Sequence, residues 1–150
     1  ALRLRLKTMN VDILQASDGR AGLRLVRERK PDLVISDWWM ERGDGEYLLN
    51  RLQSQPDTAQ IPVIMVSGVG RPEFMSRMVA QGAQSCYTKP LQFDVLREDI
   101  CTLLDLEPSN GQRTRAVAAA SRQRSRNLKG SNERIRLARS EATGSFHWSN

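Results

Sequence analysis

The chain has 150 residues, of which 39% are hydrophobic, and this suffices for one domain with a buried core. No apolar run is long enough to cross a bilayer and no basic-then-apolar leader opens the sequence, so we expect a cytoplasmic protein. Because His147 is the single histidine, the sequence argues against a histidine-rich metal site and against a Ser-His-Asp triad. Cys86 and Cys101 lack the spacing of a metal knuckle or redox pair, and we expect free thiols.

The net charge of +6 is unevenly distributed along the chain. Residues 1–105 carry 14 basic and 14 acidic side chains, whereas residues 106–150 carry 9 basic and 3 acidic ones. The sequence therefore predicts a neutral folded body followed by a basic tail.

From Val11 to Leu104, short β-branched runs alternate with amphipathic segments in the order β-α-β-α-β-α-β-α. Such alternation is typical of a parallel sheet covered by helices. The expected strands are Val11–Ala16, Leu33–Ser36, Pro62–Ser67 and Ser85–Thr88. Their nearly continuous apolar character suits strands that are buried on both faces.

The helices between these strands have recognisable ends. Ser17 or Asp18 can cap the first helix, and Pro31 ends it because proline disfavours helix in the residue before it. Pro72 suits a first helical turn, and Gly82 can take the left-handed conformation that closes that helix. The apolar faces of two further helices are formed by Leu48, Leu49 and Leu52, and by Leu96, Ile100 and Leu103.

The two ends of the chain are harder to interpret. Leu2, Leu4 and Leu6 alternate as in a strand, but Leu2, Leu6 and Met9 also share one helical face, so both interpretations stay open. A polar Pro108–Gly111 stretch marks a boundary near Leu106. Residues 107–150 have few large apolar groups, and we expect a disordered tail or linker with transient helices at Arg115–Arg126 and Glu133–Ala142.

Polar side chains follow three of the predicted strands. Asp37 comes after Leu33–Ser36, Ser67 ends Pro62–Ser67, and Lys89 follows Thr88. Because ligands gather at the carboxyl ends of parallel strands, we expect these groups to lie together at one edge of the sheet. A carboxylate there can attack a phosphoryl group, while a hydroxyl and an ammonium can hold its oxygens. Taken singly, each residue would be a commonplace helix cap, turn hydroxyl or solvated cation.

The sequence resembles the receiver domain of two-component response regulators, the CheY-like family with a flavodoxin-like doubly wound sheet. The resemblance covers residues 1 to about 106. It is carried by the pattern D-x-x-M-x-x-x-D-G that begins at Asp37, by Ser67 after an apolar strand, and by Thr88-Lys89-Pro90, at spacings that match the family.

This resemblance implies phosphorelay signalling by a protein that is not itself an enzyme. It implies that Asp37 is the phosphoacceptor, that Ser67 and Lys89 contact the phosphoryl group, and that Asp37 and the Trp39 backbone carbonyl bind Mg²⁺. The implied partner is a histidine kinase or a phosphotransfer protein, with an output domain as a further possibility.

The sequence departs from the family pattern at four places. The residues given begin after the family's first strand, which ends in the acidic Mg²⁺ ligands, so we expect these residues to form an incomplete metal site. Glu41 stands where the family often has proline. Cys86 replaces the usual switch aromatic, and Tyr87, one place later, should face the opposite side of the strand. Trp38 and Trp39 are bulky neighbours of Asp37, either at the rim of the site or on a partner surface.

The missing strand lies in the middle of the family sheet. We therefore expect Val11–Ala16 and Leu33–Ser36 to pair directly, to recruit Leu2–Leu6, or to leave backbone groups unpaired. We also expect a chain that is unstable or rearranged, that binds Mg²⁺ poorly, and that accepts little phosphate from acetyl phosphate. An acidic strand encoded upstream of Ala1 would identify the chain as a fragment.

Two other functions stay open. The chain could be a degenerate receiver that docks partners without phosphorylation, as Cys86 and the absent acidic strand suggest. Residues 112–139 could instead bind nucleic acid electrostatically, although no aromatic side chains are interleaved there.

Overall fold

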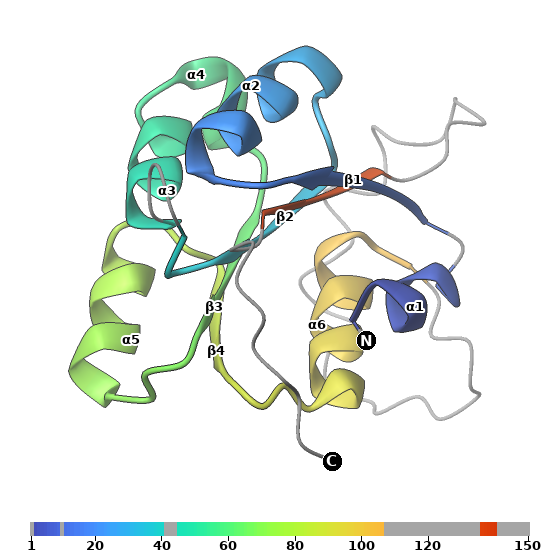
Figure 1. Cartoon of the computed structure of the whole chain (residues 1–150), viewed down its shortest axis with the longest axis vertical. Coiled ribbons are helices and arrows are strands. Elements are labelled where there is room, and N and C mark those ends of the chain that lie inside the picture. Colours follow the sequence, from blue (N-terminus) through green and yellow to red (C-terminus); the bar gives the residue numbers. More distant parts are fainter. Residues whose placement is uncertain (1, 10, 41–44, 107–135, 141–150) are drawn as a thin grey trace.

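The computed structural model describes residues 2–9, 11–40, 45–106 and 136–140. Five strands within these ranges form one sheet (Figure 1). All neighbouring strands are parallel, in the order β1-β5-β2-β3-β4. The strands are β1 (Asp12–Ala16), β2 (Leu33–Asp37), β3 (Val63–Ser67), β4 (Ser85–Thr88) and β5 (Arg136–Ser140).

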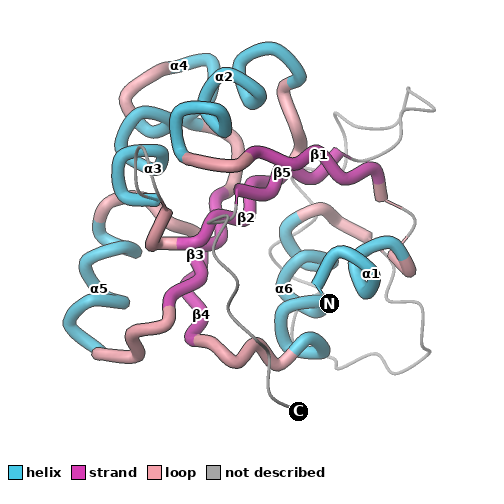
Figure 2. The backbone as a smooth tube through the Cα atoms, in the orientation of Figure 1, coloured by secondary structure: helices cyan, strands magenta, loops and turns pink. Residues whose placement is uncertain are grey.

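Helices cover both faces of the sheet. They are α1 (Leu2–Lys7), α2 (Gly19–Arg29), α3 (Gly45–Gln53), α4 (Pro56–Ala59), α5 (Pro72–Ala80) and α6 (Phe93–Leu103). Helices α2, α3 and α5 lie on one face, and α1 and α6 lie on the other (Figure 2). None of the helices in the described part of the chain is long and apolar enough to span a membrane.

Two hydrophobic clusters form the core between the sheet and the helices on its two faces. One contains Val26, Leu48, Leu49, Leu52 and Met78 from the helices, packed on Val34, Val63 and Met65 of the sheet. The other contains Leu6, Leu96 and Ile100 from α1 and α6, packed on Leu33, Ile35 and Ile64. Successive residues of a strand point to opposite faces, so the apolar runs of β2 and β3 supply both clusters at once.

The predicted α/β class is confirmed, and the four predicted strands agree with the observed ones to within one residue. The ambiguous N-terminal segment forms helix α1, with Leu6 fully buried. Helix α4 was not predicted. It begins at Pro56, and the buried hydroxyl of Thr58 donates a hydrogen bond to the carbonyl of Leu52, 2.8 Å away.

The predicted helix ends are also observed. Asp18, rather than Ser17, caps α2, and its Oδ1 accepts a hydrogen bond from the Ala21 amide at 2.8 Å. Lys30 ends that helix in the left-handed region with φ 41°. Gly82, at φ 103°, occupies the left-handed conformation expected after α5.

The expectation of a sheet without its central strand is wrong. Strand β5 lies between β1 and β2 and pairs in parallel with both. Neither direct pairing of β1 with β2 nor recruitment of Leu2–Leu6 occurs. The physical reason is that β5 supplies hydrogen-bond partners to two strand edges that would otherwise be buried without them.

The expectation that residues 107–150 lack a packed core is therefore wrong for Arg136–Ser140. Leu137 is fully buried and Ala138 is 2% exposed, because the rest of the sheet and its helices provide the surrounding core. The segment is also a strand rather than part of a transient helix. Residues 107–135 and 141–150, including the rest of the expected tail, lie outside the described residues.

Helix α3 begins very close to the end of β2. A Cβ atom built on Gly45 would lie 2.3 Å from the Asp37 carbonyl oxygen and 2.7 Å from the Met65 Cε. The Gly45 amide donates a hydrogen bond to the Trp38 carbonyl at 2.8 Å. Only a residue without a side chain lets the helix start at this distance from the strand.

We expect Asp18→Ala to lower the free energy of unfolding at pH 7 by about 1 kcal/mol, because the α2 cap is lost. The hydrogen bond from the Ala21 amide, helped by the Ser17 hydroxyl, lowers the pKa of Asp18 in the folded state. Its stabilisation is therefore present above about pH 4 and is lost as the pH falls through the lowered pKa. Urea unfolding across this range tests the effect. Asp18→Asn should retain the cap without its pH dependence, and equal stability of the Ala variant would contradict the assignment.

We expect Gly45→Ala to destabilise the protein by about 1–3 kcal/mol, because the added methyl group meets backbone atoms that cannot move independently. Gly68→Ala is the matched control at the same edge of the sheet, where an added Cβ meets nothing within 4 Å. Thermal unfolding of the two variants measures the difference. Equal melting temperatures would show that α3 can shift away from the strand at little cost.

Candidate functional site

The carboxyl ends of three parallel strands bring the predicted polar residues to one edge of the sheet. Asp37 ends β2, Ser67 ends β3 and Lys89 directly follows β4. Backbone hydrogen bonds fix these ends relative to one another. The Lys89 amide donates to the Ser67 carbonyl at 2.8 Å, and the Trp38 amide donates to the Val66 carbonyl at 2.7 Å. The site is therefore held by the sheet rather than by a loop.

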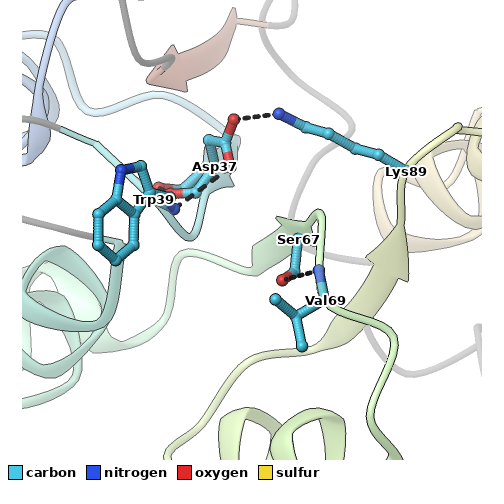
Figure 3. A network of polar contacts seen from close by, with 6 residues as sticks. Asp37, Trp39, Ser67, Val69 and Lys89 are labelled. Atoms are coloured by element: carbon cyan, nitrogen blue, oxygen red, sulfur yellow. Dashed lines mark hydrogen bonds and ion pairs between the residues drawn. The ribbon is translucent and has the colours of Figure 1, made fainter. Parts of the chain in front are cut away.

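The Asp37 carboxylate is the centre of this arrangement (Figure 3). Its Oδ2 forms an ion pair with the Lys89 ammonium, and its Oδ1 accepts a hydrogen bond from the Trp39 amide at 3.3 Å. The side chain of Asp37 is 11% exposed and that of Lys89 is 32% exposed. The pair is thus mostly shielded from water, while the lysine side retains access to solvent.

Ser67 lies on the neighbouring strand and is only 2% exposed. Its Oγ accepts a hydrogen bond from the Val69 amide at 3.0 Å (Figure 3). A hydroxyl can accept one hydrogen bond and donate another, so this contact orients the oxygen and leaves its proton available for a donor role.

The two tryptophans after Asp37 differ in their surroundings. Trp38 packs against the core and meets Phe74 edge to face, with ring centroids 4.5 Å apart. Trp39 is 75% exposed and extends on the side of Asp37 away from Lys89 (Figure 3). Of the two, Trp39 therefore presents an aromatic surface to solvent.

The switch positions on β4 face opposite sides, as the strand period predicts. Cys86 packs against the cluster under α2, α3 and α5, and burial raises the pKa of its thiol. Tyr87 packs against the cluster under α6 and donates a hydrogen bond to Asp99 Oδ2 at 3.0 Å. Burial and this carboxylate raise the pKa of the Tyr87 hydroxyl. The same Asp99 oxygen accepts from Ser85 Oγ at 2.5 Å, a contact that strand and helix patterns in the sequence do not signal.

The donor set for Mg²⁺ stays incomplete in the described residues. Asp37 and the Trp39 carbonyl are the two expected ligands that the chain contributes, and no group of three His, Cys, Asp or Glu side chains comes together there. The Lys89 ammonium also occupies one oxygen of the carboxylate. A hard cation that needs about six oxygen ligands is poorly matched by such a set.

Solved structures that are similar to this chain include receiver domains of response regulators. The chain matches the receiver domain of Francisella response regulator 1452 with a TM-score of 0.65 and 27% identity, over 69% of this chain and 84% of that one. It matches the signal receiver domain of a DNA-binding response regulator from Colwellia psychrerythraea with a TM-score of 0.57 and 37% identity, over 60% and 73% of the two chains.

The chain is also similar in sequence to part of several curated regulatory proteins. The chain is 34% identical over 83 residues to the probable C4-dicarboxylate response regulator DctR of Bacillus subtilis, covering 55% of this chain and 36% of that protein. It is 30% identical over 101 residues to the DNA-binding dual master transcriptional regulator RpaA of Synechocystis, covering 67% and 42%. The chain thus spans less than half the length of these two relatives.

The profile of the response regulator receiver domain matches residues 1–101, which include every strand-end residue of the site. Together with the parallel sheet and the arrangement of Asp37, Ser67 and Lys89, this match covers most of the described fold. The chain belongs to the response regulator receiver domain family.

Proposed function

We propose that this domain accepts a phosphoryl group on Asp37 from the phosphohistidine of a histidine kinase or phosphotransfer protein. The observation that supports this most directly is the ion pair between Asp37 and Lys89, at the edge of the sheet where Ser67 ends the neighbouring strand. A largely shielded carboxylate with one adjacent cation is suited to a reaction that brings more negative charge to the same place.

In the proposed step, a carboxylate oxygen of Asp37 attacks phosphorus and forms an O–P bond. The P–N bond to the donor imidazole breaks, and the electron pair of that bond leaves with the imidazole nitrogen, which takes up a proton. The product is an acyl phosphate on Asp37. Because the attacking and leaving atoms must be in line, positioning and charge neutralisation account for most of the catalysis.

Lys89 and Ser67 would act on the phosphoryl oxygens. The Lys89 ammonium shifts from the carboxylate to a phosphoryl oxygen as charge moves onto that group. Its backbone is anchored to Ser67, so the ammonium can make this shift by side-chain rotation alone. Ser67 keeps its contact with the Val69 amide and donates its proton to a second phosphoryl oxygen.

Receiver domains generally depend on Mg²⁺, yet the described residues do not provide a full set of ligands for it. We therefore assign no step of the transfer to a metal. In its absence, neutralisation of the phosphoryl group depends on Lys89, and transfer should be slow.

The incomplete donor set favours a second function, docking of a partner protein without phosphorylation. Cys86 in place of the switch aromatic supports the same alternative, because a cysteine side chain has no aromatic ring that could move between two positions. The two functions differ in whether Asp37 is modified, and a direct assay separates them.

We expect incubation with a phosphorylated histidine kinase, or with acetyl phosphate and Mg²⁺, to produce a shifted band on a Phos-tag gel. This band should appear slowly, because transfer is slow. Asp37→Asn, which keeps the size of the side chain but removes the nucleophile, should abolish the shift. An equal shift in the Asn variant would exclude Asp37 as the acceptor. A folded parent protein that shows no shift with either donor would favour the docking function.

We expect Lys89→Ala to slow the formation of phosphorylated Asp37 by at least about tenfold, because the cation beside the acceptor is lost. Ser67→Ala should slow it by a smaller factor, and Ser67→Thr should retain most of the rate, because its hydroxyl is preserved. Time courses on Phos-tag gels give these rates, and circular dichroism checks that the variants are folded. Unchanged rates for both Ala variants would remove these residues from the site.

A further inference from the structure

Three arginines of helix α2 lie on one side of that helix. Arg20, Arg24 and Arg27 are exposed and stand at spacings i, i+4 and i+7, so they form a row along one face. At a rise of about 1.5 Å per residue, this row extends over about 10 Å. Leu23 and Val26 bury the adjacent side of α2 in the core, so the packing of the helix holds the row at the surface.

The row lies on the side of α2 that faces α3 and α4. The Arg27 Nε atom donates a hydrogen bond to Gln55 Oε1 at 3.2 Å, and Gln55 is the residue directly before α4. Helices α2 and α3 also pack against each other on the same face of the sheet (Figure 1). The arginine row is therefore next to the side of α3 that faces α2.

Helix α3 adds a fourth arginine and an aromatic ring to this surface. Glu46 marks the side of α3 that faces α5, because it accepts a hydrogen bond from Gln81 Nε2 at 2.7 Å and forms an ion pair with Arg77. Arg51 is exposed on the opposite flank, about 140° around the helix from Glu46. Tyr47 is 36% exposed and lies one turn before Arg51 on the same flank. We call the surface formed by the row, Tyr47 and Arg51 the basic face.

The positive charge of the basic face is poorly neutralised. None of its four arginines forms an ion pair with a carboxylate of the described residues. Glu46 is paired with α5, Asp57 is paired with the end of α2, and Glu28 forms no ion pair with the described residues. Asp18 caps α2 and interacts with Arg24 only at longer range than an ion pair. Like charges at i, i+4 spacing disfavour a helix, so a bound anion would relieve repulsion within the row.

We propose that the basic face binds single-stranded nucleic acid through its phosphate backbone. The four cations of this face are all arginines, and the planar guanidinium matches two phosphate oxygens with two parallel N–H donors. The exposed ring of Tyr47 offers a surface on which a base can stack. A basic track beside an aromatic ring is typical of binding to single strands without sequence preference.

The aromatic ring favours nucleic acid over an acidic polypeptide as the ligand. Both ligands carry oxygen anions that arginine can bind, but only the nucleic acid has bases that stack on Tyr47. The binding does not involve Asp37, so it is a function in addition to phosphoryl transfer.

The test compares two triple variants of the full chain that remove equal charge. One variant carries Arg20→Gln, Arg24→Gln and Arg27→Gln, which neutralise the row. The control carries the same change at three exposed cations outside the basic face, Arg3, Lys7 and Arg71. The probe is a fluorescein-labelled oligothymidylate, and its anisotropy gives the affinity over a range of salt concentrations. Circular dichroism checks that both variants are folded.

We expect the row variant to bind at least about tenfold more weakly than the parent at low salt, and the control to stay within about twofold of it. The slope of log Kd against log salt concentration should decrease by about 2 in the row variant, because three phosphate contacts are lost. Parent affinity in the row variant would place binding in the basic residues 106–150 and overturn the proposal. Equal weakening in both variants would show an effect of net charge alone and would also overturn it.

Lysine at the three row positions is a variant that keeps the charge and tests the fold. Its salt slope should equal that of the parent, because the same number of phosphates is neutralised, while its affinity should fall because the bidentate contacts are lost. A slope as low as that of the glutamine variant would attribute the loss of binding to damage of α2 and contradict the proposal.

The nature of the ligand is tested at Tyr47 and by competition. Tyr47→Leu should weaken binding severalfold with an unchanged salt slope, and Tyr47→Phe should bind like the parent, because the ring is kept. Full affinity in the Leu variant would overturn the stacking role that selects a single strand. Displacement of the probe by poly-L-glutamate as readily as by unlabelled oligothymidylate would overturn the assignment to nucleic acid.

Discussion

Hydrogen bonding of the backbone in the middle of the sheet is the constraint on which the rest of this structure depends. Strands β1 and β2 each present a row of amide and carbonyl groups to the space between them, and each unpaired buried group costs about 1–3 kcal/mol. Strand β5 pairs with both rows. Its Leu137 and Ala138 belong to the two hydrophobic clusters, so this short segment, like β2 and β3, contributes to the core on both faces of the sheet.

Much of the fold could be predicted from the sequence because its signals are local. Strands β2 and β3 are apolar on both faces, and proline, glycine and aspartate mark the ends of the helices. The positions of Asp37, Ser67 and Lys89 follow from the same reasoning, since residues after parallel strands meet at one edge. Local signals did not predict how closely α3 approaches β2 at Gly45, although the Asp-Gly pair in the motif marks that turn.

Strand β5 could not be predicted because its burial is supplied by residues far away in the sequence. Arg136–Ser140 has only two apolar side chains, and the average composition of residues 107–150 is that of a polar tail. The segment gains a core from β1, β2 and the helices above and below them rather than from its own neighbours. The contact of Tyr87 and Ser85 with Asp99 escaped prediction for the same reason, because it joins β4 to α6 across the sheet face.

The contacts around the site indicate where a phosphoryl group would first disturb the domain. On β4, Tyr87 is held by Asp99 and packs against the α6 cluster, while Cys86 has no ring to reorient. On β3, by contrast, the Ser67 hydroxyl is joined directly to the backbone of the following loop through the Val69 amide. Any change in the position of that hydroxyl must move or break this hydrogen bond. A structural response to phosphorylation would therefore begin in the loop after β3, and from there it would reach the start of α5 at Pro72.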